Sequence, residues 1–487
     1  MLLTHSYHLF YDRKQVRKMQ PYPPLGTLYA AALLRQHGIS VAVFDTMLND
    51  PEEGFAAALA RHRPQLVAVY EDSFNFLSKM CLTRMREVAF HMIRTARTAG
   101  IPVVVNGSDA SDNAAEYLQR GCECVLLGEA ENTLLEVIQA LLGPYWPNWD
   151  RIPGIAFLRA PDGNLVRTAA RPLIRNLETL PFPARDLVDL EPYRKAWKNA
   201  HGLFSLNLVS SRGCPYRCNW CAKPIYGNAF HARSAESVAQ EMKLLKEYGA
   251  DHLWFADDIF ALKQRWAGEL AAAVERLDAA VPFKMQSRVD LMTRPTVSAL
   301  RRAGCAEVWM GAESGSQKVL DAMDKDTRVE QIVAARENLL RHGIRACYFL
   351  QFGYPGETWS DIQKTIELVR NTRPDDIGVS VSYPLPGTKF YERVVEQLGA
   401  KTNWSDSDDL AMMFRGAYRD EFYHALHDAL HAEVETWNHA ADTAAHSAPA
   451  VQELWERVFS LEKTCRSQTP MAGPRREVMA TAAQFAD

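Results

Sequence analysis

The sequence predicts an α/β protein in which two parallel-sheet domains precede a group of helices. Three observations support this. Strand-like and helix-like segments alternate over residues 1–143, they alternate again over 206–383, and apolar residues recur at helical spacing after residue 400. A chain of 487 residues is too long for one ordinary domain and should divide into two or three.

The first domain is expected over residues 1–143. Its helical segments include 27–38, which ends at Gly38. Five strand–helix units fit a flavodoxin-like, Rossmann-like doubly wound sheet, which binds ligands at the carboxyl ends of its strands. The strand candidates are short apolar runs at 2–10, 41–45, 66–70, 102–106 and 123–128. The loops expected to line the crevice are 22–26, 71–75, 106–111 and 128–131.

Residues 144–200 are expected to connect the two domains. Prolines and tryptophans interrupt the periodic pattern here, and Asp162-Gly163 is typical of a hairpin turn.

The second domain is expected over residues 201–400 as six further strand–helix units. Its clearest helix begins after Ser234, a good N-cap residue, and runs to about Gly249. Six units predict a partial (β/α)6 barrel of the TIM type, whose chemistry lies at the carboxyl ends of the strands. The strand candidates are 206–210, 252–256, 283–287, 306–311, 345–351 and 377–383.

Residues 401–487 are expected to form C-terminal helices and a loose tail. One apolar helix face recurs from Phe422 to Trp437, a second helix covers about 451–462, and the tail begins near residue 466. Three histidines share the first helix, and a solvated face explains them better than a metal site does: His424, His427 and His431.

Composition and charge limit the classes of partner that we expect for this chain. A net charge of −4 and a pI near 6.4 give no reason to expect nucleic acid or an anionic membrane. No apolar run approaches the roughly 18 to 20 residues of a membrane span, and the N-terminus lacks a signal-peptide layout. Nine cysteines without a secretion signal indicate the reducing cytoplasm, where clustered thiols usually hold metal.

The strongest motif is SRGCPYRCNWCAKP, in the loop after the first barrel strand. Cys214, Cys218 and Cys221 stand at C-x3-C-x2-C spacing. Thiolates select iron–sulfur clusters, which normally take four, so three leave one iron open. An open iron can chelate the amino and carboxylate groups of S-adenosylmethionine (SAM), and an electron from the cluster can then release a 5′-deoxyadenosyl radical. The alternative is structural zinc, but the nearest fourth ligand, His231, is poorly spaced.

This motif, with Trp220 before its last cysteine, resembles the radical SAM signature, and the resemblance continues along the barrel. It implies that strand-end residues bind SAM: FADDIF its amino group, Arg288 its carboxylate, GAESGS its ribose, and QFGYPGET and SYPLPGT its adenine side. The cofactor-binding residues implied in this way are Trp220, Asp257, Asp258, Arg288, Glu313, Ser314, Gly353 and Tyr383.

A sheet domain before such a barrel resembles the cobalamin-dependent radical SAM family, which includes C-methyltransferases and the anaerobic magnesium-protoporphyrin ester cyclase. YPPLGTLYAAALLRQHG and LLGEAENTLLE carry this resemblance. The chain lacks D-x-H-x-x-G, so no histidine is offered to cobalt, and Asp109 stands where the family usually has histidine. A remnant sheet serving as a lid or dimer surface is the alternative. The residues implied to bind cobalamin are Gly26, Ser73, Gly107, Asp109, Gly128 and Glu129.

The resemblance implies cobalamin-dependent methylation of an unactivated carbon. Radical cyclisation, oxidation or rearrangement without methyl transfer is the alternative, and a non-catalytic iron–sulfur regulatory module is a third. The expected partners are a small-molecule or peptide substrate and an electron donor such as flavodoxin or ferredoxin. A methylthiotransferase would need a second cysteine triad, whereas the remaining cysteines have the contexts of buried apolar residues: Cys81, Cys122, Cys124, Cys305 and Cys347. Trp309 is expected in the core or the barrel wall.

Overall fold

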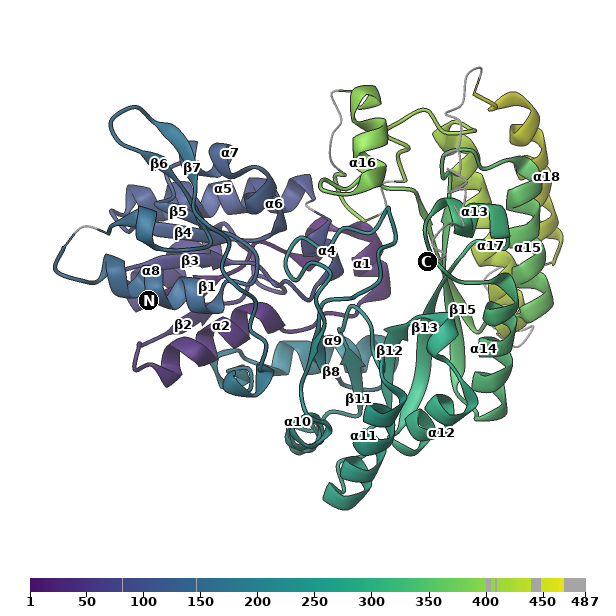
Figure 1. The fold of residues 1–487 in the computed structure, drawn as a ribbon, viewed down its shortest axis with the longest axis horizontal. Helices are drawn as coiled ribbons and strands as arrows, with labels where there is room; N and C mark the ends of the chain where they lie inside the picture. Colours follow the sequence, from purple (N-terminus) through teal and green to yellow (C-terminus); the bar gives the residue numbers. More distant parts are fainter. Residues whose placement is uncertain (81, 146, 400–403, 408–409, 439–447, 468–487) are drawn as a thin grey trace, which may run out of the picture.

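The computed structural model describes residues 1–80, 82–145, 147–399, 404–407, 410–438 and 448–467. Two α/β units lie next to each other, the first drawn in purple to blue and the second in teal to green (Figure 1). No helix among these residues is long and apolar enough to cross a membrane.

The first unit has the strand order β2-β1-β3-β4-β5-β6-β7, and β1 to β5 pair in parallel. This is the flavodoxin-like order that the sequence predicts, with its switch point between β1 and β3. The expected strand 2–10 ends early, because its neighbours stop pairing with it at Thr4. The parallel strands are β1 (Leu2–Thr4), β2 (Ala42–Phe44), β3 (Val67–Tyr70), β4 (Val103–Asn106) and β5 (Cys124–Leu126).

Helices cover both faces of this sheet. Alternate residues of β3 pack into two different apolar cores. Val67 and Val69 lie in one core, and Ala68 and Tyr70 lie in the other. A strand that is apolar on both sides is typical of a parallel sheet covered on both faces. The helices are α2 (Leu25–Gln36), α3 (Glu53–His62), α4 (Phe76–Lys79), α5 (Thr83–Thr98), α6 (Ser108–Asp112), α7 (Ala114–Gln119) and α8 (Glu131–Leu141).

Part of the expected connector joins the first sheet. β6 (Ile155–Arg159) and β7 (Asn164–Arg167) form the predicted hairpin, and Gly163 in its turn has a φ of +69°. β6 pairs antiparallel with β5, so the sheet continues past residue 143. The connector then forms α9 (Glu191–His201) before the barrel begins.

The second unit is the predicted six-stranded partial barrel, with the parallel order β15-β14-β13-β12-β11-β8. Ser234 caps α10, its side chain accepting from the Ser237 N–H. The strands are β8 (Ser205–Leu208), β11 (His252–Phe255), β12 (Phe283–Ser287), β13 (Cys305–Glu313), β14 (Arg345–Phe352) and β15 (Asp376–Val381). The helices between them include α10 (Ala235–Glu247), α11 (Gln264–Leu277), α12 (Arg294–Arg302), α13 (Gln317–Ala322), α14 (Val329–Arg341) and α15 (Trp359–Thr372).

The amino-terminal half of the barrel interior is filled by the first unit. Lys284 of β12 contacts the segment between β1 and α2. Its Nζ donates a hydrogen bond to Gln20 Oε1 at 2.9 Å. The same ammonium lies 5.8 Å from the ring centre of Tyr22 and 5.9 Å from those of Trp197 and Trp254. Burial lowers the pKa of Lys284 to about 8.

The C-terminal helices α17 (Asp420–Asn438) and α18 (Ala448–Thr464) pack on each other, and α17 lies beside β15 (Figure 1). Of the three histidines expected on a solvated face of α17, only His424 is exposed, whereas His427 and His431 are half-buried. The expected tail at 468–487 and Cys81 lie outside the described residues. The other four cysteines expected to be buried are buried: Cys122, Cys124, Cys305 and Cys347.

Candidate functional site

The cysteine motif occupies a loop whose base is closed by a short ribbon. β9 (Ser211–Arg212) pairs antiparallel with β10 (His231–Ala232). Gly213 has a φ of +81°, and a Cβ there would collide with the carbonyl oxygen of Ala229. Only glycine fits this position, so the loop leaves the ribbon in a defined direction.

The three cysteines of this loop are free thiols of intermediate exposure. Burial raises the pKa of Cys214 and raises that of Cys221 to about 12. In the described part of the chain, no three His, Cys, Asp or Glu side chains converge on one metal position. Three thiolates in one loop are a donor set that fits a 4Fe–4S cluster, because thiolates are the usual ligands of such clusters. Cluster binding would release the thiol protons.

The paired carboxylates after β11 have different surroundings. Asp257 is fully buried and accepts hydrogen bonds from the Ser210 N–H at 3.0 Å, the Ser210 Oγ at 2.6 Å and the Ser211 Oγ at 2.5 Å. Burial raises its pKa to about 6, against these hydrogen bonds. Asp257 thus fastens β11 to the start of the cysteine loop. Asp258 is 25% exposed and pairs with Lys79 of α4, in the first unit, at 2.5 Å.

Arg288 follows β12 and lies beside the cysteine loop. Its guanidinium lies 3.7 Å from the ring centre of Tyr216, pairs with Asp290 at 2.9 Å, and directs Nη1 at the Cys218 Sγ at 3.9 Å. Trp220 is half-buried, and its Nε1 is buried with no hydrogen-bond partner among the described residues. The Arg288 guanidinium therefore adjoins a thiol of the loop, and Trp220 holds a buried donor in the same loop.

Glu313 ends β13 in a left-handed conformation, with a φ of +59°. This conformation costs a residue with a Cβ about 1 to 2 kcal/mol. The carboxylate pairs with Lys325 at 2.7 Å, and both side chains are buried. Ser314 is fully buried, its Oγ lying 3.1 Å from the Thr365 hydroxyl.

Gly353 follows β14 with a φ of +77°, and an added Cβ would lie 2.7 Å from Met412. Its N–H donates to Glu357 Oε2 at 2.6 Å. Tyr383 follows β15 and meets Trp404 edge-on, with ring centres 4.3 Å apart. Both predicted adenine-side positions therefore adjoin the segment that follows the barrel.

The carboxyl edge of the first sheet holds the residues predicted to face cobalamin. Gly26 donates its N–H to Asp72 at 2.9 Å, and the Ser73 hydroxyl lies 2.9 Å from that of Tyr226 in the cysteine loop. Gly107 has a φ of +154°, and an added Cβ would lie 2.7 Å from Glu71. The absence of a Cβ at Gly107 therefore lets the Glu71 side chain pack closely against its backbone.

Two of these predicted residues use their carboxylates on protein partners. Asp109 pairs with Arg86 at 2.5 Å and accepts from Tyr117 at 2.7 Å, which anchors α6 to α5 and α7. Glu129 pairs with Arg212 at 2.5 Å. Gly128, with a φ of +66°, turns the chain between β5 and this carboxylate. The roles of these residues as cobalamin contacts stay predictions.

Arg212 joins the two units and was not singled out by the sequence. It pairs with Glu129 at 2.5 Å and with Glu131 at 2.8 Å, and all three side chains are at most 4% exposed. Its guanidinium lies within 5.5 Å of three ring centres, those of Tyr29, Phe74 and Tyr226. Because Arg212 precedes Cys214 by two residues, this buried cluster fixes the cysteine loop to the last loop of the first sheet.

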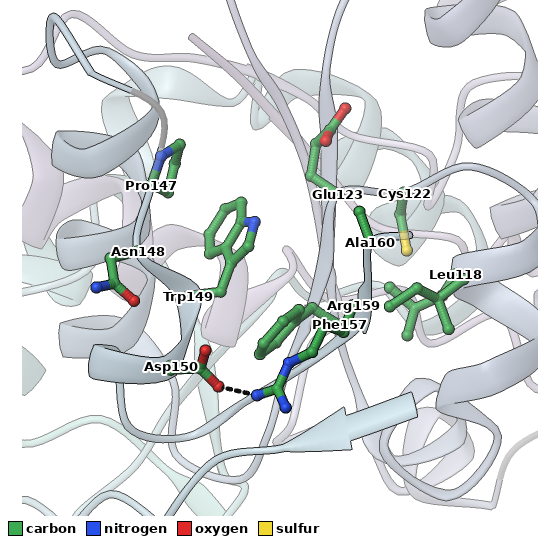
Figure 2. A pocket seen from close by; sticks show the side chains of 11 residues that line it. Leu118, Cys122, Glu123, Pro147, Asn148, Trp149, Asp150, Phe157, Arg159 and Ala160 are labelled. Carbon is green, nitrogen blue, oxygen red and sulfur yellow. Dashed lines mark hydrogen bonds and ion pairs between the residues drawn. The ribbon is translucent and has the colours of Figure 1, made fainter. Parts of the chain in front are cut away.

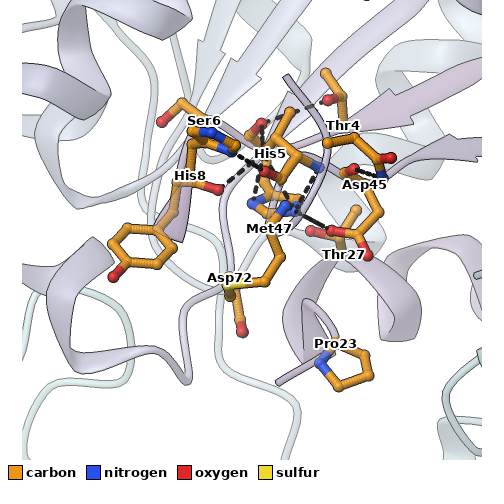
Figure 3. A network of polar contacts seen from close by, with 12 residues as sticks. Thr4, His5, Ser6, His8, Pro23, Thr27, Asp45, Met47 and Asp72 are labelled. Carbon is orange, nitrogen blue, oxygen red and sulfur yellow. Dashed lines mark hydrogen bonds and ion pairs between the residues drawn. The ribbon is translucent and has the colours of Figure 1, made fainter. Parts of the chain in front are cut away.

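A second unpredicted network lies just beyond the carboxyl ends of β1 and β2 (Figure 3). His5 Nε2 lies 2.8 Å from Asp45 Oδ1, and Tyr193 of α9 donates to Asp45 Oδ2 at 2.5 Å. Burial is the largest effect and opposes protonation of His5, but the hydrogen bond to Asp45 and the negative charges of Asp45, Glu71 and Asp72 together outweigh it and raise the pKa. The other ring nitrogen of His5 lies 3.2 Å from the Thr46 hydroxyl. His5 is therefore engaged within the protein.

One open hollow of about 520 Å³ lies away from this region. It is lined by Cys122 and Glu123, which precede β5, and by Trp149 and the hairpin (Figure 2). These residues stand at the amino end of β5, the opposite edge of the sheet from the Arg212 cluster. The hollow is therefore separate from the candidate site.

Comparisons with known proteins match two parts of the chain to two different families. Residues 208–369 match the Radical SAM superfamily, and residues 19–138 match the B12 binding domain. An uncharacterized methyltransferase of Pyrococcus horikoshii is 26% identical over 391 residues, 78% of this chain and 81% of that protein. The anaerobic magnesium-protoporphyrin IX monomethyl ester cyclase of Rubrivivax gelatinosus is 23% identical over 390 residues, 77% of this chain and 67% of that protein.

Two solved structures share the fold. The radical SAM methyltransferase TsrM of Kitasatospora setae, with cobalamin and a 4Fe–4S cluster bound, gives a TM-score of 0.66 at 21% identity. The match covers 81% of this chain and 77% of that one. The cobalamin-dependent radical enzyme OxsB gives 0.66 at 15% identity, over 95% of this chain and 71% of that one. Residues 208–369 therefore form a domain of the radical SAM superfamily and residues 19–138 form a B12-binding domain, and the cofactors of these domains are a 4Fe–4S cluster, SAM and cobalamin.

Proposed function

We propose that this enzyme methylates an unactivated carbon of its substrate. The observation that supports this most directly is the meeting of two carboxyl edges. The loops after β3 and β5 of the first sheet contact the cysteine loop of the barrel through Ser73–Tyr226 and Glu129–Arg212. Methyl transfer needs the donor and the activated carbon in near contact, and edges joined in this way bring their ligands together.

When bound, the cluster supplies the electron that splits SAM into methionine and a 5′-deoxyadenosyl radical, and the cobalamin supplies the methyl group. The chain contributes position and charge. Asp258, which pairs with Lys79, and Arg288, which directs Nη1 at the Cys218 Sγ, offer opposite charges suited to the amino and carboxylate groups of SAM. Glu313, held by Lys325, offers an acceptor suited to the ribose hydroxyls. Asp257 acts behind them, since its oxygens are engaged by Ser210 and Ser211.

Radical ring formation without methyl transfer is the second candidate. The relative from Rubrivivax gelatinosus is named as a cyclase, and its similarity spans both domains of this chain. The two functions differ in what they take from SAM. A methylating enzyme consumes methyl groups and leaves S-adenosylhomocysteine, whereas a cyclase needs only the radical.

The remaining partners follow from this chemistry. The substrate is a small molecule or a peptide, and the cluster requires a one-electron donor of the flavodoxin or ferredoxin class. The eight described cysteines are all free, which suits a reducing cytoplasm.

The test is an anaerobic assay of the reconstituted protein with SAM, a low-potential reductant and hydroxocobalamin. We expect 5′-deoxyadenosine together with at least one equivalent of S-adenosylhomocysteine per bound cobalamin, the latter vanishing when cobalamin is omitted. The matched control is the Cys214→Ala/Cys218→Ala/Cys221→Ala protein, which should form no 5′-deoxyadenosine. 5′-Deoxyadenosine without S-adenosylhomocysteine would favour the cyclase class, and the absence of both products would refute the radical mechanism.

A further inference from the structure

A pair of aromatic rings lies on the concave face of the barrel. In β13 and β14 the residues that point outward toward the helices are fully buried, including Met310, Tyr348 and Leu350. Trp309 and Phe349 alternate with them and therefore face the interior. Their ring centres are 5.0 Å apart at an interplanar angle of 31°. Phe349 is nevertheless 37% exposed, which is unusual for a phenylalanine in the middle of a barrel strand.

Glycines flank this pair at the same level of the sheet. Gly311 lies opposite Phe349 on one side, and Gly378 lies opposite it on the other. An added Cβ at Gly378 would lie 3.2 Å from Phe349 and 3.4 Å from Trp309, so the rings extend over the backbone of β15. Trp309 is fixed by its Nε1, which donates to Glu307 at 2.7 Å. The result is an apolar surface of two rings inclined by 31°, which we call the Trp309–Phe349 platform.

The platform lies closer to the SAM-binding end of the barrel than the filled half of the interior does. Lys284, which contacts Gln20 and Tyr22 of the first unit, is level with Glu307 in the sheet. The platform begins two residues farther along β13, and Glu313 ends the same strand four residues beyond Trp309. A molecule on the platform would therefore lie between the filled half and the SAM-binding edge.

A buried, unpartnered acceptor adjoins the platform. Gln351 is two residues beyond Phe349 on β14 and so faces the same side. It is 2% exposed, and its Oε1 has no hydrogen-bond partner among the described residues. Burying an amide oxygen without a donor costs about 1 to 3 kcal/mol, so this atom is suited to a donor supplied by a ligand.

We propose that the Trp309–Phe349 platform and Gln351 form the substrate subsite, and that it takes a flat conjugated ring with an N–H or O–H donor at its edge. The proposal rests on the proposed function, because it concerns the molecule that the radical attacks. Aromatic faces hold a flat ring by offset stacking, and Gln351 Oε1 would fix its orientation in the plane.

The experiment uses two matched pairs of probes and equilibrium binding to the anaerobic, cofactor-loaded enzyme. Indole and N-methylindole differ in the donor, and benzyl alcohol and cyclohexylmethanol differ in flatness. We expect wild type to bind indole about threefold to tenfold more tightly than N-methylindole, and benzyl alcohol more tightly than cyclohexylmethanol by a similar factor. Equal affinities within either pair would overturn the proposal, and this result needs no variant.

Two variants locate the preferences. Phe349→Ala should remove the preference for the flat alcohol, and Gln351→Leu should remove the preference for indole over its N-methyl derivative. Phe459→Ala, at a residue 48% exposed on α18, is the control and should keep both preferences. Preferences that survive both platform variants would place the probes elsewhere and refute the subsite. Formation of 5′-deoxyadenosine without any probe reports the radical chemistry separately, so loss of the proposed function is distinguishable from loss of the platform.

Discussion

Replacing Arg212 by methionine should destabilise the contact between the two units. The change keeps most of the apolar stem but leaves the Glu129 and Glu131 carboxylates, 3% and 4% exposed, without their cation. Removing one partner from a buried ion pair typically costs about 3 to 5 kcal/mol, because the remaining charge is uncompensated. Arg276→Met is the matched control, since its pair with Glu236 is solvent-exposed and should contribute at most about 1 kcal/mol.

The loss of stability caused by Arg212→Met should depend on pH in a defined direction. Burial, then the neighbouring Glu131 charge, raises the pKa of Glu129 in the folded protein. A carboxyl whose folded pKa is raised contributes stability below its unfolded pKa of about 4.3, and this contribution is lost as pH rises through the folded value. Without Arg212 this rise must be larger, so the deficit of the variant should grow from pH 5.5 to pH 8.

The assay is anaerobic urea unfolding, followed through the midpoint of the first transition. With a slope of about 3 kcal/mol per molar urea, the Arg212→Met deficit corresponds to about 1 to 2 M. Adding Glu129→Gln and Glu131→Gln to Arg212→Met should recover most of it, because the repelling charges are then gone. A shift no larger than that of Arg276→Met, or a triple variant no more stable than Arg212→Met, would refute this account of the cluster.

Three further predictions concern the cofactors and the cysteine loop. Protein in which Cys214, Cys218 and Cys221 are all alanine should hold no cluster iron after anaerobic reconstitution, whereas iron equal to wild type would remove these thiols from the site. Gly107→Trp should abolish saturable hydroxocobalamin binding, since even a Cβ there meets Glu71 at 2.7 Å; retained affinity would place the corrin elsewhere. Because burial raises the pKa of Asp257 to about 6, its contribution to stability should be lost as pH rises through 6, and Asp257→Asn should flatten this dependence of the urea midpoint.

The sequence predicts the order of the elements well, because that order follows from local patterns. Alternating apolar runs give the five parallel strands and the six-stranded barrel, and the cysteine spacing places the cluster loop after β8. The long first strand, 2–10, was wrong for a non-local reason. A strand extends only as far as its neighbours pair with it, and β2 and β3 release it at Thr4.

Side-chain direction could not be predicted, because it depends on partners far away in the sequence. Asp257 and Asp258 are adjacent and identical in type, yet one is buried against Ser210 and the other reaches Lys79. Glu129 was expected at cobalamin, but its partner Arg212 is 83 residues away. The GEAE motif carries the acidic Glu129 and Glu131, and the SRGC motif carries the basic Arg212. These opposite charges were the available clue that the two motifs meet.

The segment between β1 and α2 constrains how this enzyme admits its substrate. Gln20 and Tyr22 reach the barrel interior, and Trp197 donates its Nε1 to the Pro21 carbonyl at 2.7 Å. Separating the two units would withdraw Gln20 and Tyr22 from the barrel interior and expose a lysine and several aromatic rings to water. Such a separation would therefore be unfavourable in free energy. The strand ends near Gly353 and Tyr383 are contacted by the chain that follows β15, so movement of that segment would open this side of the barrel without separating the two units.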